Sequence, residues 1–308
     1  RRSEVYLILF PEKLASNSEE FFILRLLSFN ILAQNLLETH PYLYKEHDKQ
    51  ALSWEIRRPL ILQEILEVIC LQEVQREHLQ EILVPFKELG YKYLYKKRTN
   101  DKKDGLLFLY RSDQLLLLDY AKVELYQSGI ELLSRDNVGI IAKLAVKNNP
   151  EIQLVVATTH LLYNPKRNDV RLGQTQLLLL ENSESHSADA NTSYDIARCG
   201  EMNIDSTDAQ TVQIANGCNA KFSSGTLTHP FNLYSIYDHQ FRGEREATTN
   251  QGEWITVDYI FYSDMEPLEK YRLPTVKECT SLPTIPNFVV GSDHLCLGAT
   301  FKVSKSKC

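Results

Sequence analysis

Short apolar runs, several of them ending in a polar side chain, recur along this 308-residue sequence and constrain its fold more than any other feature. Each run has the length and residue types of a β-strand. The runs are residues 5–10, 22–30, 91–96, 106–110, 138–146, 152–160, 254–262 and 295–303. A few longer segments with helical periodicity lie between them. This arrangement predicts an α/β fold in which two sheets pack face to face with helices outside.

The expected helices are residues 52–68, 77–89 and 170–181. Pro59 is expected to kink or restart the first helix, and Gly90 to stop the second. The first helix runs into the apolar residues 68–71 without turn residues, which raises the question of a missing loop near residues 66–69. The same question arises near residues 181–198. The polar segments 182–193 and 205–224 are expected to be exposed loops.

The length fits either one large domain or two small ones. The polar ends of the strand-like runs extend from Asn30 to His294, which favours a single domain over residues 1–308 with residues 1–20 at its periphery. With 43% hydrophobic residues the chain has enough apolar side chains for a substantial core. No apolar stretch is long enough to span a bilayer, and residues 5–10 lack the length and flanks of a signal peptide.

The six cysteines show no paired spacing, and Cys70 and Cys296 lie inside apolar runs. This pattern favours a reducing cytosolic or nuclear setting over secretion. The net charge of −6 argues against a protein that coats nucleic acid nonspecifically. Two local basic clusters remain compatible with phosphate binding, although solvated loop charge explains either cluster equally well. They are Lys96, Lys97, Arg98, Lys102 and Lys103, and then Lys166, Arg167 and Arg171.

Three of the polar strand ends have the chemistry of a phosphoester-cleaving site. Such a reaction needs an activated water and groups that neutralise the charge gained by the phosphate oxygens. Mg²⁺ keeps most of its own waters and needs only one or two protein carboxylates. Glu73, after the apolar residues 68–71, is a candidate metal ligand. Asn30 is a candidate for binding the phosphate or for supporting that ligand. His160 is a candidate catalytic residue, although a lone histidine is more often structural.

Asp258 and His294 are expected to form a pair. Asp258 lies in the apolar run 254–262, and a carboxylate buried there needs a partner such as a histidine. Asp293 precedes His294 directly in the sequence. Because neighbouring strand residues point to opposite faces, Asp293 is not expected to orient His294.

Six motifs, in chain order, resemble those of the DNase-like endonuclease/exonuclease/phosphatase superfamily. They are Ser28-Phe29-Asn30, Leu71-Gln72-Glu73, Thr159-His160-Leu161, Gly200-Glu201-Met202-Asn203, Val257-Asp258-Tyr259 and Ser292-Asp293-His294. Four further segments resemble the Angel branch, which is related to nocturnin and the carbon-catabolite-repression deadenylases. They are Asn30-Ile31-Leu32-Ala33-Gln34, Trp54 with Arg57-Arg58-Pro59, Arg135-Asp136-Asn137-Val138-Gly139, and His160-Leu161-Leu162-Tyr163-Asn164-Pro165.

The resemblance implies a four-layer α/β sandwich and Mg²⁺-dependent attack on the phosphates of an RNA 3′ end, with Mn²⁺ as a substitute cation. In this pattern His160 would stabilise the charged phosphorane, Asn203 would orient the phosphate, and His294 would contact the phosphate or relay a proton. The implied catalytic residues are His160, Glu201, Asn203, Asp258 and His294, the metal ligands Glu73 and Asp293, and the substrate-binding residues Asn30, Asn164, Lys166 and Arg167.

One motif departs from the family pattern. Relatives carry Gly-Asp-x-Asn where this chain has Gly200-Glu201-Met202-Asn203, and that Asp is the residue thought to position or activate the water. Glutamate keeps the charge but moves the carboxylate by about one bond, and a displacement of ~1 Å costs up to ~10²-fold in rate. The substitution therefore predicts weak activity unless the backbone has shifted to compensate.

Three functions fit these residues: removal of a terminal 2′,3′-cyclic phosphate, 3′-to-5′ shortening of poly(A), and binding by a degenerate site. A deadenylase is expected to stack successive adenines on aromatic side chains, whereas a cyclic phosphatase needs a tight pocket for one terminal ribose. The candidate stacking residues are Tyr126, Tyr163, Phe231 and Tyr234.

The binding function has a pattern of its own. Tyr110-x-x-x-x-Leu115-Leu116 resembles the pattern by which partners grip the cap-binding translation initiation factor, which makes that factor a candidate partner. The same residues also fit a buried strand.

Overall fold

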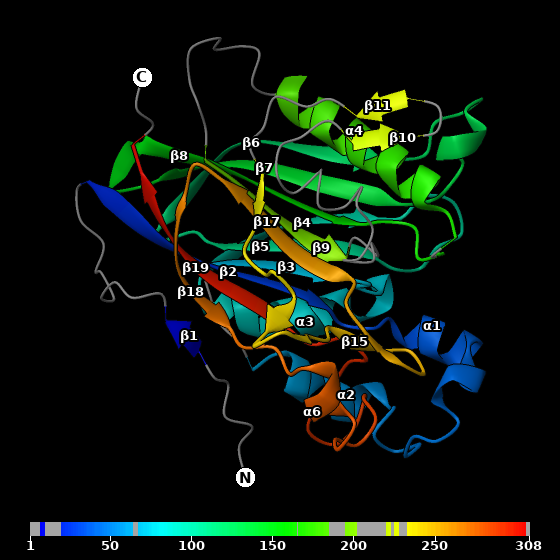
Figure 1. The fold of residues 1–308 in the computed structure, drawn as a ribbon. Helices are drawn as coiled ribbons and strands as arrows, with labels where there is room; N and C mark the ends of the chain where they lie inside the picture. Colours follow the sequence, from blue (N-terminus) through cyan, green and yellow to red (C-terminus); the bar gives the residue numbers. More distant parts are fainter. Residues whose placement is uncertain are drawn as a thin grey trace.

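The computed structural model describes the side chains of residues 20–63, 67–164, 166–181 and 233–305, and the backbone of residues 7–9, 182–184, 195–201, 220–222 and 225–227. Within these residues two large sheets dominate the fold (Figure 1). No helix among the described residues has the length and apolar character needed to cross a membrane.

The two large sheets have seven and six strands. The first has the order β1 (Leu7–Leu9), β18 (Glu266–Tyr271), β19 (Leu297–Ser304), β2 (Phe21–Asn30), β3 (Val68–Gln72), β5 (Gly105–Arg111) and β4 (Tyr91–Lys97). The second has the order β12 (Tyr234–Ser235), β17 (Asp258–Ser263), β9 (Asp195–Glu201), β8 (Asn149–His160), β7 (Val138–Val146) and β6 (Leu115–Glu124). Each sheet is mixed, because β2 pairs with β3 and β8 pairs with β9 in parallel, while the other pairs are antiparallel.

Short elements connect and cover the sheets. The short strands are β10 (Ala220–Phe222), β11 (Gly225–Leu227), β13 (Gln240–Phe241), β14 (Glu244–Arg245), β15 (Thr249–Asn250) and β16 (Trp254–Ile255). The helices are α1 (Gln34–Thr39), η1 (Pro41–Tyr44), α2 (Trp54–Ile61), η2 (Arg76–His78), α3 (Leu79–Glu88), η3 (Glu131–Leu133), α4 (Asn168–Glu184) and α6 (Val276–Cys279).

Three apolar clusters show that the expected four layers are present. The largest cluster lies between the sheets, where Phe108 of the first sheet and Leu154 of the second are fully buried. A second joins the outer face of the first sheet to α2 and α3, with Phe86 packed against Leu107. A third joins the outer face of the second sheet to α4. Figure 1 shows α4 on one side of the stacked sheets and α2 and α3 on the other. Burial of each sheet on both faces explains the continuous apolar runs of the sequence.

Most of the predicted elements are confirmed, and two are wrong in extent. The helix expected over residues 52–68 ends at Ile61, because the following chain must reach Val68, where β3 starts to pair with β2. The strand expected over residues 254–262 is broken between β16 and β17. There the backbone amides of Val257 and Asp258 donate to the Thr248 hydroxyl, at 2.9 and 3.2 Å, instead of to a neighbouring strand.

Several expectations fall on parts of the chain that the structure does not describe. Missing loops were suspected near residues 66–69 and 181–198, and of these regions residues 66 and 185–194 lie outside the described residues, as does most of the segment 205–224.

Two of the three residues in the pattern considered for the cap-binding factor are part of the core, while Leu116 is 48% exposed. Tyr110 is 4% exposed on β5, and Leu115 is 1% exposed at the start of β6. A partner cannot grip side chains that are packed between the sheets, so the predicted partnership is not supported.

A histidine is buried near β17. His239 is 2% exposed and its ring lies against Tyr237 and Tyr259, with centroid separations of 5.9 and 4.5 Å. Among the described residues neither ring nitrogen has a hydrogen-bond partner. Burial, aided by the nearby Lys270 charge, lowers the pKa of His239 to about 3.

This histidine predicts loss of stability in acid. A histidine in the unfolded chain has a pKa of about 6.5. Below that pH the unfolded chain therefore binds a proton at His239, whereas the folded chain keeps this histidine neutral. Stability is therefore complete above pH 6.5 and falls as the pH falls toward 3, with a loss of about 2 kcal/mol from this residue at pH 5. We expect His239→Phe to remove that loss in urea unfolding at pH 7 and pH 5, with His40→Phe as the control. An equal acid loss in the wild type and His239→Phe would contradict the assignment.

Candidate active site

The candidate site lies where the parallel strands of both sheets end. Asn30 ends β2 and Glu73 follows β3, while His160 ends β8. The antiparallel neighbours begin at the same place, with Asp258 at the start of β17 and His294 shortly before β19. The topology therefore gathers residues from position 30 to position 294 at one end of the sandwich, as expected for a layered fold.

The Glu73 carboxylate is held on both oxygens. Its Oε1 accepts a hydrogen bond from Asn30 Nδ2 at 3.0 Å, and its Oε2 accepts one from the Ala33 amide at 3.0 Å. Asn30 Oδ1 in turn accepts from the Leu32 amide at 3.0 Å. Glu73 and Leu32 both have φ of +57°, a left-handed conformation that costs a residue with a side chain on the order of 1 kcal/mol. The strained backbone thus lies at Glu73 itself and in the loop that binds its carboxylate.

The expected pairing of Asp258 with His294 is present. His294 Nδ1 lies 2.9 and 3.2 Å from the two Asp258 carboxylate oxygens, and both side chains are buried. The opposite ring nitrogen, Nε2, lies 3.4 Å from Asn30 Nδ2. A carboxylate at Nδ1 favours the tautomer with its proton there and leaves Nε2 as an acceptor facing the Asn30 amide.

Asp293 is held by different partners from those of its neighbour. Its Oδ2 accepts from the Tyr44 hydroxyl at 2.8 Å, and its backbone carbonyl accepts from Thr249 Oγ1 at 2.7 Å. Burial, together with the charges of Asp293 and Glu73, raises the pKa of Tyr44 far above its usual value. Tyr44 therefore stays protonated and lies close to both carboxylates.

Arg57 joins the two parts of the chain that carry the site. Its side chain is fully buried, and Nη1 donates to the carbonyls of Ile31 at 3.0 Å and Gly291 at 2.9 Å. Its Nη2 donates to the carbonyl of Leu32 and to Gln34 Oε1, both at 2.9 Å. Burial lowers the pKa of Arg57 to about 10, so the guanidinium is still charged at neutral pH. One cation thus fixes the loop after Asn30 against the segment before His294.

His160 is fixed through its backbone by two buried amides. Asn137 Nδ2 donates to the His160 carbonyl at 2.8 Å, and Asn137 Oδ1 accepts from Gln174 Nε2 at 2.9 Å. Gln174 Oε1 accepts from the Leu162 amide at 3.0 Å. The imidazole Nε2 lies 3.9 Å from Glu73 Oε1. The histidine from one sheet and the carboxylate from the other thus face the same space.

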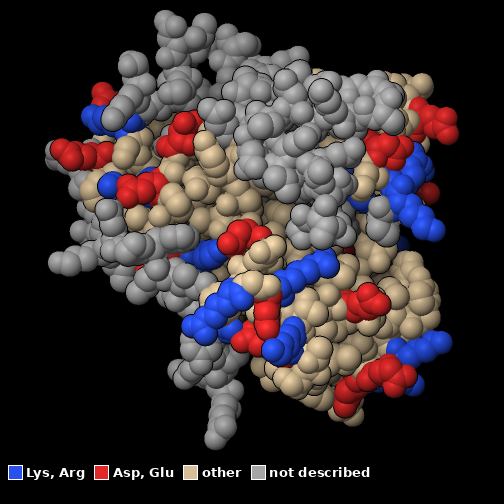
Figure 2. Space-filling model, in the orientation of Figure 1, with Lys and Arg blue, Asp and Glu red and all other residues tan. Residues whose placement is uncertain are grey.

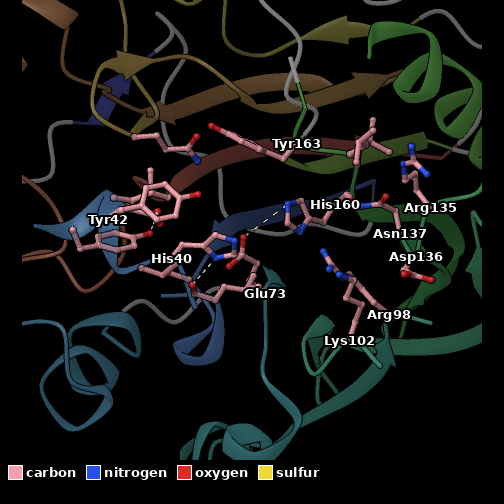
Figure 3. A pocket seen from close by; sticks show the side chains of 18 residues that line it. His40, Tyr42, Glu73, Arg98, Lys102, Arg135, Asp136, Asn137, His160 and Tyr163 are labelled. Atoms are coloured by element: carbon pink, nitrogen blue, oxygen red, sulfur yellow. Dashed lines mark hydrogen bonds and ion pairs between the residues drawn. The ribbon is translucent and has the colours of Figure 1, made fainter. Parts of the chain in front are cut away.

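That space is a cavity of about 450 Å³ (Figure 3). Glu73, His160 and Asp293 line it, so two carboxylates and an imidazole are accessible to a ligand. The other lining residues are Leu32, Leu36, His40, Tyr42, Leu43, Tyr44, Arg98, Lys102, Arg135, Asp136, Asn137, Leu161, Leu162, Tyr163 and Gln251.

The four predicted substrate-binding residues do not line the cavity. Asn164 Oδ1 accepts from the Lys166 amide at 3.0 Å, and Arg167 Nε donates to Asp169 Oδ1 at 3.0 Å, so they organise the turn before α4. Asn30 is 1% exposed and holds Glu73 instead.

Two predicted catalytic residues lie at the limit of the described chain. The backbone of Glu201 ends β9 and is the register partner of both His160 on β8 and Asp258 on β17. The Glu201 side chain and the whole of Asn203 lie outside the described residues.

Sequence reasoning missed the residues that support the site. Arg57 and Asn137 lie in motifs that resemble the family, but nothing in those motifs shows what they bind. Tyr44 follows a proline in the short helix η1 and has no sequence signal. Their roles depend on contacts between segments that are far apart in the chain.

The carboxylates fit a hard divalent cation. Among the described residues no group of three or more His, Cys, Asp and Glu side chains forms a complete metal cage. Mg²⁺ does not need one, because it keeps several waters and binds through one or two carboxylates. Glu73 and Asp293 supply oxygen donors at the cavity, and both lie near the Tyr44 hydroxyl.

Solved structures define the fold class. The fold matches the human Nocturnin catalytic domain with a TM-score of 0.70 and 23% identity, over 99% of each chain. An endonuclease/exonuclease/phosphatase from Bacteroides vulgatus matches with a TM-score of 0.64 and 16% identity, over 92% of this chain and all of that one. The fold is therefore that of the endonuclease/exonuclease/phosphatase class. No family model matches the sequence.

Closer relatives define the family. Protein angel of Drosophila melanogaster is 38% identical over 91% of this chain and 80% of its own length. Protein angel homolog 2 of Homo sapiens is 30% identical over 93% of this chain and 70% of its own length. A crystal structure of ANGEL2, described as a 2′,3′-cyclic phosphatase and bound to adenosine-2′,3′-vanadate, matches with a TM-score of 0.87 and 31% identity, over 97% of this chain and 99% of that one. The chain belongs to the Angel family.

The contacts of Arg57 predict a large effect on stability. Arg57→Met keeps a similar length but leaves buried carbonyl oxygens without their charged donor, and each such loss costs on the order of 1–3 kcal/mol. We expect the free energy of unfolding in urea to fall by about 3 kcal/mol or more. Arg58→Met is the control, because Arg58 is exposed and pairs with the exposed Glu81, which predicts a change below about 1 kcal/mol. Equal losses in both variants would contradict the role of Arg57.

Proposed function

We propose that this chain is a divalent-cation-dependent phosphoesterase that removes a terminal 2′,3′-cyclic phosphate from RNA. The observation that carries the proposal is the cavity of about 450 Å³ lined by Glu73, His160 and Asp293. Its volume lies within the range of roughly 300–1,000 Å³ typical of sites for a single small ligand. That size suits one terminal nucleotide better than a row of stacked bases. The description of ANGEL2 as a 2′,3′-cyclic phosphatase supports the same choice.

Complete removal of the phosphate takes two hydrolytic steps. In the first, water adds to phosphorus and one of the two ribose P–O bonds breaks, leaving a phosphomonoester. In the second, another water releases orthophosphate and leaves the 2′,3′-diol. Both steps need the same groups, which must stabilise charge on the phosphate oxygens and protonate the departing ribose oxygen.

The residues have separate roles in this proposal. Mg²⁺ held by Glu73 and Asp293 would supply Lewis-acid stabilisation of the phosphate charge. His160 donates a hydrogen bond to the phosphate oxygens as they gain charge. His294, which is oriented by Asp258 and does not itself line the cavity, would reach the phosphate or carry a proton at Nε2 only if Nε2 leaves the Asn30 amide. Asn30 keeps the Glu73 carboxylate in position.

The proposed deadenylase alternative has less support at the cavity. Of the aromatic residues considered for adenine stacking, Tyr163 lines the cavity. Tyr126 and Tyr234 do not line it, and Phe231 lies outside the described residues. The four residues considered for stacking therefore do not form a platform together at the cavity.

Two RNAs distinguish the functions. We expect the purified protein with Mg²⁺ to release orthophosphate from an oligonucleotide ending in a 2′,3′-cyclic phosphate, and to leave an oligo(A) with free hydroxyls at full length. Gel electrophoresis and phosphate detection measure both outcomes, with EDTA as the control that abolishes release. A ladder of shortened oligo(A) would favour the deadenylase instead, and inertness toward both RNAs would favour a binding module.

Glu201, in the motif that differs from the family pattern, gives a second test. The backbone of Glu201 lies in register between His160 and Asp258, where the carboxylate that positions the water is expected. If its extra methylene misplaces that carboxylate, Glu201→Asp raises kcat, by up to ~10²-fold. Single-turnover rates on the cyclic phosphate measure the effect, with Glu151→Asp on the far end of β8 as the control. An unchanged or lower rate would show that glutamate is correctly placed.

A further inference from the structure

One side of the cavity carries three cations. Arg98, Lys102 and Arg135 line it and form what we call the basic wall. Figure 3 shows them on the His160 side of the cavity, while His40 and Tyr42 lie on the opposite side. The chain has a net charge of −6, and on the face shown in Figure 2 acidic and basic side chains are interspersed. The basic wall is therefore a local feature that the overall charge does not explain.

The basic wall is built from both sheets and is held rigidly. Arg98 and Lys102 lie in the loop between β4 and β5, where Lys97 Nζ donates to the carbonyls of Arg98, Asn100 and Lys102 at 2.9, 2.8 and 2.6 Å. The Lys97 ammonium group therefore holds the loop in one shape.

Asp136 connects that loop to the second sheet. Its Oδ1 accepts from Thr99 Oγ1 and Asn100 Nδ2, both at 2.6 Å. Asp136 follows Arg135 directly and precedes β7. These bonds fix the distance between the cations of the β4–β5 loop and Arg135.

The cations of the basic wall are poorly neutralised by the protein. Arg98 Nε lies 3.4 Å from the buried Asp104 carboxylate. Arg135 Nη1 donates to the carbonyl and hydroxyl oxygens of Ser134, and neither Arg135 nor Lys102 has a carboxylate partner among the described residues. Lys102 and Arg135 line the cavity without carboxylate partners among the described residues, and such cations attract an anion.

The opposite side of the cavity has different chemistry. Leu36, His40, Tyr42 and Leu43 line it, and the rings of His40 and Tyr42 meet edge to face with centroids 5.9 Å apart. A nucleobase packs well on such a surface. With the reacting phosphate at Glu73 and His160, the charged group left to be bound is the phosphodiester on the 5′ side of the terminal nucleotide.

We propose that the basic wall binds this phosphodiester, so that the substrates are polynucleotide ends and not free 2′,3′-cyclic mononucleotides. The inference rests on the proposed function and deepens it. Charge-assisted hydrogen bonds to one phosphate predict that kcat/KM for a dinucleotide exceeds that for a mononucleotide by about 10- to 100-fold.

The test compares three substrates, two of which differ only in the charge of the linkage. They are adenosine 2′,3′-cyclic phosphate, a diadenosine ending in the same cyclic phosphate, and that dinucleotide with an uncharged methylphosphonate linkage. We expect the natural dinucleotide to be preferred, and the methylphosphonate to react like the mononucleotide. In Lys102→Ala and Arg135→Ala the preference for the natural dinucleotide falls about tenfold.

Lys103→Ala is the matched control. Lys103 neighbours Lys102 and is exposed, but it does not line the cavity, so the preference should persist. Equal kcat/KM on the natural and the methylphosphonate dinucleotide would contradict the proposed role of the basic wall. The same loss of preference in Lys103→Ala would also contradict it. Neither result would affect the proposed function.

Binding without turnover separates the two proposals. In EDTA, fluorescence anisotropy of a labelled dinucleotide should show weaker binding to Lys102→Ala and Arg135→Ala than to wild type and Lys103→Ala. If this pattern appears but no substrate loses phosphate, the proposed function fails and the basic wall is retained. If all four proteins bind equally, the basic wall is excluded.

Discussion

The site depends on one buried cation. The Arg57 side chain is fully buried, and its guanidinium donates to the carbonyls of Ile31, Leu32 and Gly291 and to the side-chain amide oxygen of Gln34. A buried charge needs hydrogen-bond partners, and here three carbonyl oxygens and one amide oxygen accept from the two terminal nitrogens of the guanidinium in place of a carboxylate. The charge is thus used as a structural link between two loops. Those loops carry Asn30 on one side and the Asp293 and His294 pair on the other.

The chemistry of the site follows from how the two sheets are ordered. Each large sheet has a parallel pair, β2 with β3 and β8 with β9, and each pair is flanked by antiparallel strands. The parallel strands therefore end, and their antiparallel neighbours begin, at the same edge of the sandwich. Glu73 comes from the first sheet and His160 from the second, and the cavity lies between them. Packing of the sheets sets the separation of the two groups, since neither sheet contains both.

The sequence predicts what depends on local pattern and fails where distant contacts decide. The strand over residues 138–146 appears with the same bounds, because its side chains are apolar on both faces and nothing in the fold interrupts it. The pairing of Asp258 with His294 was predictable, because a carboxylate in an apolar run needs a partner. The end of α2 at Ile61 was not, since it is set by where β3 must begin. Lys166 and Arg167 stand out as phosphate ligands by composition, yet neither lines the cavity, a fact that depends on how the turn before α4 is folded.

The pairing of β2 with β19 has a consequence for synthesis of the protein. Leu297 of β19 lies opposite Ser28 of β2, so the strand that ends at Asn30 has a partner made about 270 residues later. Until this part of the chain has been synthesised, Arg57 lacks its contact with the Gly291 carbonyl and Asn30 lacks its contact with His294. Glu73 then lies beside an incomplete pocket. A nascent chain therefore carries Glu73 well before it acquires the rest of the site.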